Sequence, residues 1–273
     1  MLDVEIAGRT PWETVQIARH RDRPYALDYI QWIFSDWVEL RGDRSYADDR
    51  AIIGGPALLD GRSVMVLGHQ KGRDTRENVE RNFGMPHPEG YRKAERLMRM
   101  AERLGVPVIT LIDTPGASAG LLDEERGQAV AIASSIATML AVRVPTIAVV
   151  IGEGGSGGAL AIGAADRLLM MENSVFMVAS PEASAAILWR DAGRAPEAAE
   201  NMKITSNELV DLGLVDGVVR EPDGGAHTDH AVAARNLAAT LTSTLMELES
   251  RPTERLLAER YHKYRDIGFY LES

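Results

Sequence analysis

Three short segments of the chain combine glycine with polar side chains, and each follows an apolar run. The first, His69–Thr75, carries the cations Lys71 and Arg73. The second is Asp113–Gly120 (DTPGASAG), and the third, Gly152–Ala159 (GEGGSGGA), has glycine at five of its first seven positions. Side chains and backbones of this kind bind anions, or present free amide hydrogens to a developing negative charge.

The third segment matches the dinucleotide-binding fingerprint. Gly152, Gly154 and Gly157 spell G-x-G-x-x-G, and Glu172 stands where an acid that binds the ribose belongs. However, the helix that follows is expected to be short, and two strand–helix units precede the motif, whereas a Rossmann unit usually opens its domain.

The same segment also matches a nucleophile elbow. Gly154–Gly158 fits G-x-S-x-G around Ser156, and Asp166 and His227 follow in the chain order of a hydrolase triad. An elbow turns directly off its strand, whereas here Gly152 and Glu153 are predicted to intervene. We therefore interpret Ser156 as a small residue whose hydroxyl caps the next helix.

A third interpretation is an oxyanion hole made of backbone amides. The amides of Gly157 and Gly158 would lie at the start of a helix, whose dipole favours an anionic oxygen there. Gly116 and Ala117 would provide a second set of amides at the same end of the sheet. The alternative is that both segments are tight turns that bind no ligand, since Pro-Gly favours a type II turn.

Hydrophobic periodicity predicts the elements that position these segments. Apolar runs predict strands at residues 63–68, 106–112, 145–151, 168–171 and 215–219. Helical spacing predicts helices at residues 27–40, 89–104, 124–141, 157–165, 181–189, 203–212 and 230–248. Continuously apolar strands joined by helices indicate a parallel sheet and an α/β fold. Ligands of such sheets bind beyond the carboxyl ends of the strands, where all three segments are expected.

Composition excludes several classes of protein. Thirty basic and forty acidic residues give a net charge of −10, which argues against general nucleic-acid binding. The chain has no cysteine, so it can form neither a disulfide nor a cysteine-ligated metal site. Met1–Trp12 shows no signal-peptide pattern, and no apolar stretch is long enough to span a membrane. We predict a cytoplasmic globular protein.

Longer motifs resemble the carboxyltransferase α subunit of bacterial acetyl-CoA carboxylase, a crotonase-like family. The resemblance covers nearly the whole chain from about Thr10, and the block Gly68–Gly90 is its most specific part. The matching segments are TPWETVQIARHRDRP at 10–24, GHQKGRDTRENVERNFGMPHPEG at 68–90, DTPGA at 113–117, EERG at 124–127, VIGEGGSGGALAI at 150–162, SPE at 180–182, GGAH at 224–227 and RYHKYRDIGF at 260–269.

The resemblance implies a crotonase-like superhelix of ββα units and an assembly with other proteins. We expect one carboxyltransferase domain over residues 1–273, with an N-terminal helical extension at 1–45 and a C-terminal helical tail at 228–273. In the family, this subunit pairs with a homologous β subunit, which carries zinc, in an α2β2 complex. The complex moves a carboxyl group from carboxybiotin, held on a biotin carboxyl carrier protein, to acetyl-CoA, and malonyl-CoA results.

The resemblance also assigns roles to residues. Gly157 and Gly158 would shelter the biotin oxygen, with Gly116 and Ala117 as the facing loop. Gly154 and Gly155 would border the substrate. Lys71 and Arg73 would attract the carboxylate or the CoA phosphates, or else form a surface ion pair. His69 and His87 are expected to be structural.

Two departures from the family pattern leave room for other functions. The family typically has Tyr-Pro where this chain has Ser118-Ala119, which predicts a wider and looser loop, and tends to have Gly-Cys at Ala183-Ser184. A self-sufficient crotonase-type hydratase or hydrolase would need an acid or base, for which the candidates are Glu124, Glu153 and Asp113. A subunit that only scaffolds a complex, or a paralogue for another acyl-CoA, is the third hypothesis.

Overall fold

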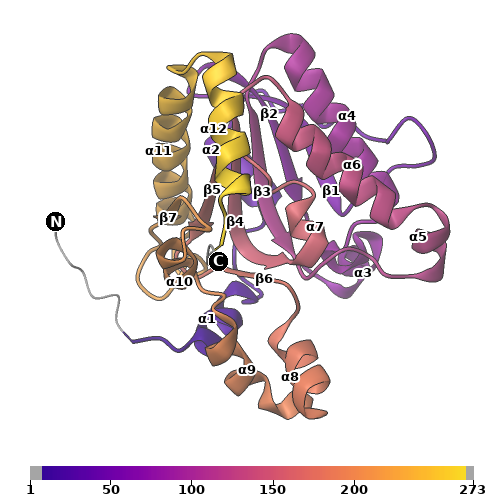
Figure 1. Ribbon diagram of the computed structural model, residues 1–273, viewed down its shortest axis with the longest axis vertical. Coiled ribbons are helices and arrows are strands. Elements are labelled where there is room, and N and C mark those ends of the chain that lie inside the picture. The colour runs from indigo at the N-terminus through magenta and orange to yellow at the C-terminus, as the bar shows by residue number, and fades with distance from the viewer. Residues whose placement is uncertain (1–7, 269–273) are drawn as a thin grey trace, which may run out of the picture.

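A mixed β-sheet runs through the centre of the protein (Figure 1). The computed structural model describes residues 8–268, which form seven strands in the order β1-β2-β3-β4-β5-β7, with β6 beside the end of β4. The β1–β2 pair is antiparallel and the other pairs are parallel. The strands are β1 (Ile52–Leu59), β2 (Arg62–His69), β3 (Val108–Thr114), β4 (Thr146–Gly155), β5 (Arg167–Met171), β6 (Val175–Met177) and β7 (Gly217–Val219).

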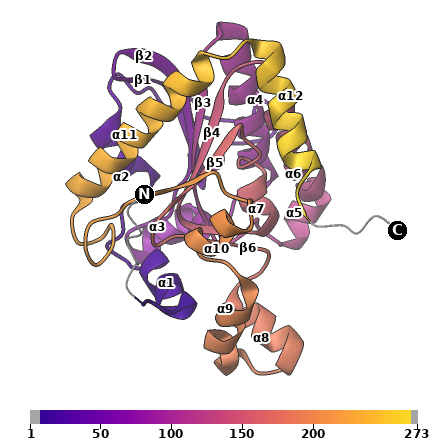
Figure 2. The same cartoon turned by 60° about the vertical axis from the view of Figure 1, so that its left-hand side comes forward.

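Helices cover both faces of the sheet, and a helical lobe formed by α8, η2 and α9 projects from one end (Figure 2). The helix α1 packs against α9 at the base of that lobe. The helices are α1 (Pro11–Ala18), α2 (Ala26–Ile33), α3 (Thr75–Glu80), α4 (Pro88–Leu104), α5 (Leu121–Glu125), α6 (Gln128–Ala141), α7 (Ser156–Leu160), α8 (Pro181–Trp189), α9 (Ala195–Met202), α10 (Ser206–Asp211), α11 (His230–Glu249) and α12 (Thr253–Arg265), with 3₁₀ turns η1 (Asn82–Gly84) and η2 (Ala192–Arg194).

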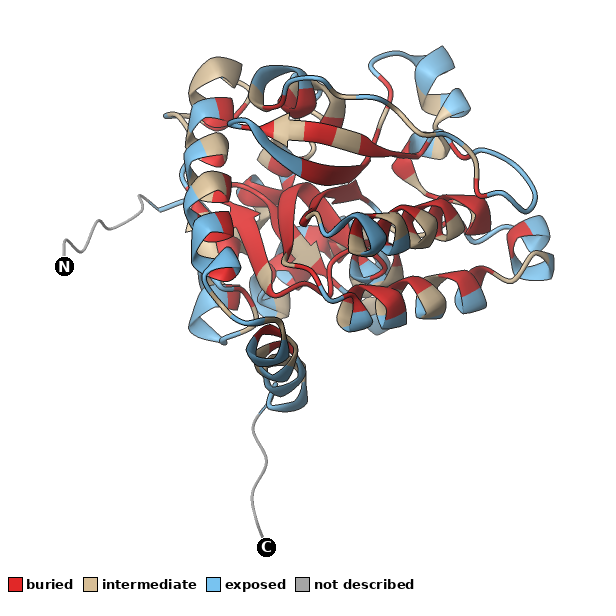
Figure 3. Ribbon diagram, turned by 90° about the horizontal axis from the view of Figure 1, so that it is seen from above, coloured by how far each residue is buried: buried red, intermediate tan, exposed pale blue. Residues whose placement is uncertain are grey.

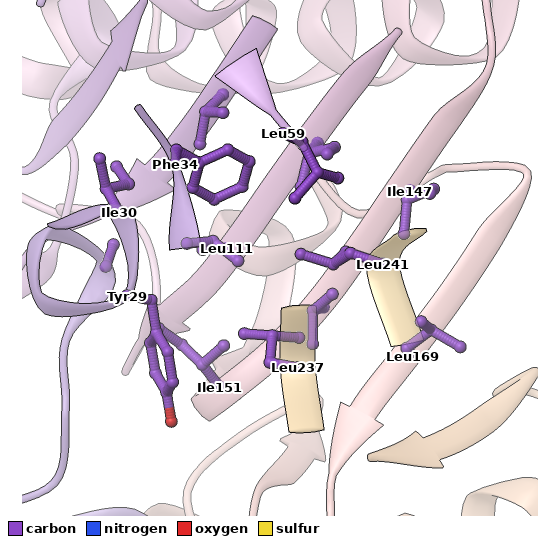
Figure 4. Close-up of a cluster of buried hydrophobic side chains, with 14 of the residues drawn as sticks. Tyr29, Ile30, Phe34, Leu59, Leu111, Ile147, Ile151, Leu169, Leu237 and Leu241 are labelled. Atoms are coloured by element: carbon purple, nitrogen blue, oxygen red, sulfur yellow. The ribbon is translucent and has the colours of Figure 1, made fainter. Parts of the chain in front are cut away.

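Alternation along the central strands divides the core into two layers. In β3, Ile109 and Leu111 point to the face covered by α2 and α11, where Figure 4 shows Tyr29, Leu111 and Leu237 packed together. Val108 and Ile112 point to the opposite face, which α4 and α6 cover. The sheet is buried on both sides, as Figure 3 shows, so strands without polar residues are stable there. The predicted α/β class follows from this burial.

The predicted helix at residues 27–40 is too long. The helix α2 ends at Ile33, and Phe34 is already extended. The backbone amides of Val38 and Leu40 donate hydrogen bonds to carbonyls of β1. The residues after Phe34 therefore pair with the edge of β1 and do not continue α2. The spacing of the apolar residues in this segment suits a strand as well as a helix.

Other predicted elements differ in their ends. The predicted helix at 124–141 is two helices, α5 and α6, because Gly127 adopts a left-handed conformation (φ +81°) at the start of α6. The predicted helix at 157–165 is only the short α7, and the one at 203–212 is only α10. The strand predicted at 145–151 continues to Gly155, which places most of the third glycine-rich segment inside β4.

No helix within residues 8–268 combines the length and the apolar character that crossing a bilayer requires. The first residues of the expected N-terminal extension, 1–7, and the end of the expected tail, 269–273, lie outside the described residues.

Candidate functional site

The three segments singled out in the sequence meet at the carboxyl ends of β2, β3 and β4. The pairing of β3 with β4 shifts its register between Ile112 and Thr114, and Thr114 pairs with Gly154. At this shift the amide of Glu153 donates a 3.0 Å hydrogen bond to the carboxylate of Asp113. The Asp113 side chain thus takes the place of a regular backbone hydrogen bond between β3 and β4, at the point where the glycine segments begin.

The two glycine segments pack backbone against backbone. A Cβ atom on Gly155 would lie 2.2 Å from the carbonyl oxygen of Pro115, and one on Gly158 would lie 2.7 Å from the amide nitrogen of Ala117. No side chain fits at either position without moving a backbone. Gly155 and Gly158 are therefore glycines because the segment 115–117 approaches closely.

The backbone amides of this junction differ in whether they are already bonded. Gly116 donates a 3.1 Å hydrogen bond to the hydroxyl of Thr114. Among the hydrogen bonds formed within residues 8–268, none uses the amide of Ala117, Gly157 or Gly158 as its donor. Gly157 and Ala117 are half-buried, whereas Gly158 is buried. The amide of Gly157 combines a free hydrogen with partial exposure.

Ser156 turns the chain sharply between β4 and α7. Its φ of +50° lies in the left-handed region, and it directly follows the strand, so the prediction that Gly152 and Glu153 form an intervening loop is wrong. The prediction that its hydroxyl caps α7 is also wrong, because Gly155 is the N-cap and no side chain bonds there. The other members of the supposed triad are elsewhere. Asp166 binds Thr146 at the opposite end of β4, and His227 stacks on His20 with ring centroids 3.9 Å apart. The structure does not assemble a hydrolase triad.

The dinucleotide interpretation also lacks support. Gly152 and Gly154 lie inside β4 rather than in a phosphate-binding turn. A Cβ on Gly154 would lie 2.5 Å from the ring of Phe176, so this glycine accommodates an aromatic side chain. Glu172 is engaged by Arg220 at 3.0 Å.

Both cations of the first segment are held by the protein itself. The Lys71 ammonium is 2.7 Å from Asp113 and 3.0 Å from Glu153, and its side chain is only 14% exposed. Arg73 stacks on the ring of Tyr25 at 3.9 Å and donates to two backbone carbonyls near the end of α1.

None of the candidate acids and bases of a self-sufficient hydratase is an unpaired group at this site. Burial pushes the pKa of Glu153 upward, but Lys71 and Arg19 outweigh it, and the pKa lies below its ordinary value. Burial also opposes the charge on Lys71, yet its two carboxylate partners raise the Lys71 pKa above the usual range. Glu124 is exposed on α5. Glu153 is therefore a paired carboxylate rather than a proton donor.

Two histidines near the site have contrasting surroundings. His69 is fully buried at the end of β2, and neither ring nitrogen has a hydrogen-bond partner within residues 8–268. Burial, and secondarily Lys71, lowers the pKa of His69 to about 3, so its ring is neutral at physiological pH. The ring of His87 contacts the Asp123 carboxylate at 2.6 Å. Among the described residues, no group of three or more histidine, aspartate or glutamate side chains could hold a metal ion.

Ser118 ties its loop to the body of the protein. Its hydroxyl donates to Asp123 at 2.5 Å, and its amide donates to the carbonyl of Pro86 at 3.0 Å. The side chain is buried. Where the sequence predicted a looser loop, the structure has a hydrogen-bonded one, because serine supplies a donor to the buried Asp123.

An apolar cavity opens beside the start of α7. Its volume is about 540 Å³, within the range of about 300–1,000 Å³ common for small-molecule sites. Its walls come from β6, α7, the end of α9, and α10 with its flanks. The lining residues are Ser156, Gly157, Leu160, Phe176, Met177, Val178, Met202, Lys203, Ile204, Leu209, Leu212 and Leu214.

Of the predicted site residues, only Gly157 lines this cavity. Gly116, Ala117, Gly154, Gly155 and Gly158 belong to the glycine segments and do not line it. Lys71 lies beside them with Asp113 and Glu153, whereas Arg73 is bound away from them, to Tyr25 and Asp28. The apolar walls were not predicted from the sequence because their residues are scattered over four elements and form no motif. The short strand around Phe176 was the available signal, since a large ring beside Gly154 implies a wall at that position.

Comparison with solved structures shows the same fold. A Pseudomonas malonate decarboxylase hetero-tetramer in complex with coenzyme A superposes with a TM-score of 0.68 at 19% identity, over 86% of this chain and 91% of that one. Transcarboxylase 12S superposes with a TM-score of 0.62 at 22% identity, over 84% of this chain and 44% of that one. This chain therefore has the same fold as these two proteins, and the predicted α/β class is confirmed.

Sequence comparison shows the family. Residues 5–268 match the family model described as "Acetyl co-enzyme A carboxylase carboxyltransferase-like". The α subunit of acetyl-coenzyme A carboxylase carboxyl transferase from Sorangium cellulosum is 56% identical over 97% of this chain and 84% of its own length. The α subunit from Thermus thermophilus is 55% identical over 96% and 83%. The chain belongs to the family of acetyl-CoA carboxylase carboxyltransferase α subunits.

Proposed function

We propose that this chain is the α subunit of a cytoplasmic carboxyltransferase that, together with a β subunit in an α2β2 complex, forms malonyl-CoA from acetyl-CoA. Carboxybiotin, presented by a carrier protein, supplies the carboxyl group. Zinc belongs to the β partner in this proposal. Family membership supports the overall reaction, and the cavity beside α7 supports the placement of the biotin-binding side on this chain.

The cavity is the observation that carries this placement. Its walls are almost entirely apolar, which suits a fused ring system with a sulfur atom and an aliphatic chain. Its few polar groups are those of Ser156 and Gly157, where α7 begins, and the ammonium of Lys203, which pairs with Glu208. An apolar pocket with a few polar groups at fixed places holds a ligand in one orientation.

Within this pocket the amide of Gly157 would donate to the ureido oxygen of biotin, and its free hydrogen fits that role. Gly158, with Gly116 and Ala117 packed against it, would hold α7 at the correct depth. Gly154 and Gly155 would act indirectly, because they admit the Phe176 wall and the 115–117 backbone.

A charge placed on the cavity wall tests this proposal. Leu160 lines the cavity and is 43% exposed, so Leu160→Glu adds a carboxylate where an anionic substrate would bind without disturbing the core. In the α–β complex we expect biotin-dependent decarboxylation of malonyl-CoA to show a KM for biotin raised about tenfold or more, which corresponds to about 1.4 kcal/mol. The KM for malonyl-CoA should stay within twofold.

The matched control is Leu104→Glu, the same substitution on an exposed leucine at the end of α4. This variant should behave like the wild type. A wild-type complex without biotin-dependent activity would overturn the proposed function. Equal biotin kinetics in both variants would overturn the placement of biotin in this cavity.

A further inference from the structure

A chain of alternating charges connects the elements around the glycine junction. Lys71 bonds Asp113 at the end of β3 and Glu153 in β4. Arg19, just after α1, bonds the other oxygen of Glu153 at 2.7 Å and continues to Glu182 of α8 at 2.6 Å. The three central members, Asp113, Lys71 and Glu153, are nearly inaccessible to solvent.

The backbone is shaped to admit these side chains. A Cβ on Gly152 would lie 2.5 Å from the Asp113 carboxylate, and one on Gly84 would lie 2.7 Å from the Lys71 stem. Gly84 also has a φ of +75°, which a side chain rarely adopts. At Gly152 the Asp113 carboxylate occupies the space of a side chain, and at Gly84 the Lys71 stem does so in addition to the left-handed backbone.

The ammonium of Lys71 lies where the two glycine segments leave the sheet. Asp113 is followed directly by the segment 114–117, and Glu153 precedes the segment 155–158 by one residue. Their carboxylates are held toward one cation, while the Glu153 amide also bonds Asp113. Without the cation, two buried negative charges would repel each other at this point.

We propose that Lys71 is a positioning residue of the carboxyltransferase, whose ammonium fixes the spacing of the segments 114–117 and 155–158 by joining Asp113 to Glu153. This inference rests on the proposed function and deepens it. Lys71 does not contact substrate in this role. It acts through the backbone contacts that Gly155 and Gly158 make with the facing segment.

The test substitutes Lys71 in the α–β complex. Lys71→Met keeps the length of the side chain and removes the charge, and Lys71→Arg keeps the charge. Since displacement of a site by about 1 Å can cost about 100-fold in rate, we expect Lys71→Met to lower kcat of biotin-dependent malonyl-CoA decarboxylation by about 100-fold. The KM for malonyl-CoA should stay within threefold, and Lys71→Arg should recover at least about tenfold of the loss.

The matched control is Lys263→Met. Lys263 is 16% exposed and pairs with Asp216, but at the amino end of the sheet. This variant is expected to lose stability and to keep kcat within twofold. If Lys71→Met does not fold, the double variant Lys71→Met/Glu153→Gln preserves the net charge of the cluster and should fold, yet still lose the link and the rate.

Hydrogen–deuterium exchange separates this inference from the function on which it rests. In Lys71→Met, the hydrogen-bonded amides of Gly116 and Glu153 should exchange at least about tenfold faster than in the wild type, and in Lys263→Met they should not. If the wild-type complex is active and the Lys71→Met variant keeps kcat within threefold of the wild type, the inference on Lys71 is overturned and the proposed function is not. An inactive wild-type complex overturns the proposed function, and unchanged exchange then overturns the inference as well.

Discussion

The two ends of the sheet use buried charge in opposite ways. At the amino end, the Arg260 guanidinium bonds both oxygens of Asp166 and four carbonyls around the end of α6. At the carboxyl end, Lys71 joins two carboxylates, while nearby amides and the ring of His69 remain without partners among the described residues. The Arg260–Asp166 pair is fully hydrogen-bonded, whereas the carboxyl end keeps donors free close to its ion pairs.

This difference separates stability from chemistry. Unpaired buried polar groups are costly, so they persist where a ligand or a reaction uses them. The ion pair at the amino end provides rigidity, but all of its hydrogen-bonding groups are already used, so none can bind a substrate. We therefore expect substitutions at the amino end to affect mainly the free energy of unfolding, and substitutions at the carboxyl end to affect activity as well.

The largest effect is expected from Arg260→Met. Removing the guanidinium leaves Asp166 buried without its partner and several carbonyls unsatisfied, which should lower the free energy of unfolding by about 3–5 kcal/mol. Urea denaturation followed by circular dichroism measures this loss. Arg255→Met, which breaks an exposed pair with Glu259, should cost less than about 0.5 kcal/mol. Similar losses in both variants would show that the buried Arg260–Asp166 pair stabilises the amino end no more than an exposed pair on the same helix does.

A smaller effect is expected from Gly155→Ala. The added methyl group would meet the carbonyl of Pro115 at 2.2 Å, so one of the two backbones must move, at about 1–3 kcal/mol. Because that movement opens the glycine junction, kcat should fall in addition. Gly217→Ala is the control, since its Cβ would lie an ordinary 3.5 Å from Leu169. Thermal unfolding and the decarboxylation assay together show whether stability and activity fall jointly.

The third prediction concerns pH. His69 has a pKa of about 3 when folded and 6.5 when unfolded, so between these values the unfolded chain binds the extra proton. Stability is therefore lost as the pH falls through this window, by about 1.4 kcal/mol per pH unit from this residue.

His69→Phe should remove this part of the slope, and His262→Gln, at an exposed position on α12, should leave it unchanged. Urea midpoints measured from pH 7 to pH 5 compare the three proteins. A His69→Phe protein with the wild-type slope would show that the ring is not a buried neutral group.

The sequence predicted well what depends on local pattern. Strands 63–68 and 168–171 were found because all their residues except Ser63 are apolar or glycine. The carboxyl-end location of the three segments follows from the topology of parallel sheets. The strand β1 was missed because Gly54-Gly55-Pro56 is typical of a turn. Position 55 is glycine because a Cβ atom would lie 1.8 Å from the carbonyl oxygen of Val38. This contact joins two segments of the chain, so the local sequence pattern does not predict it.

The charge network could not be predicted for a related reason. Lys71 is separated from Asp113 by 42 positions and from Glu153 by 82, so only the assembled sheet brings them together. The sequence singled out Lys71 by its charge and position, either for an anionic ligand or for a surface ion pair. The structure gives it two internal anions instead, because the ends of β3 and β4 both direct carboxylates toward it.

The pairing of Arg260 with Asp166 has a consequence for biosynthesis. The two residues are 94 positions apart, so Asp166 leaves the ribosome well before its partner exists. At about 5–20 residues per second, the nascent sheet waits roughly 5–20 seconds with an uncompensated carboxylate at one edge. In a nascent or truncated chain without α12, Asp166 has no arginine partner, so this end of the sheet is completed only after α12 has been translated.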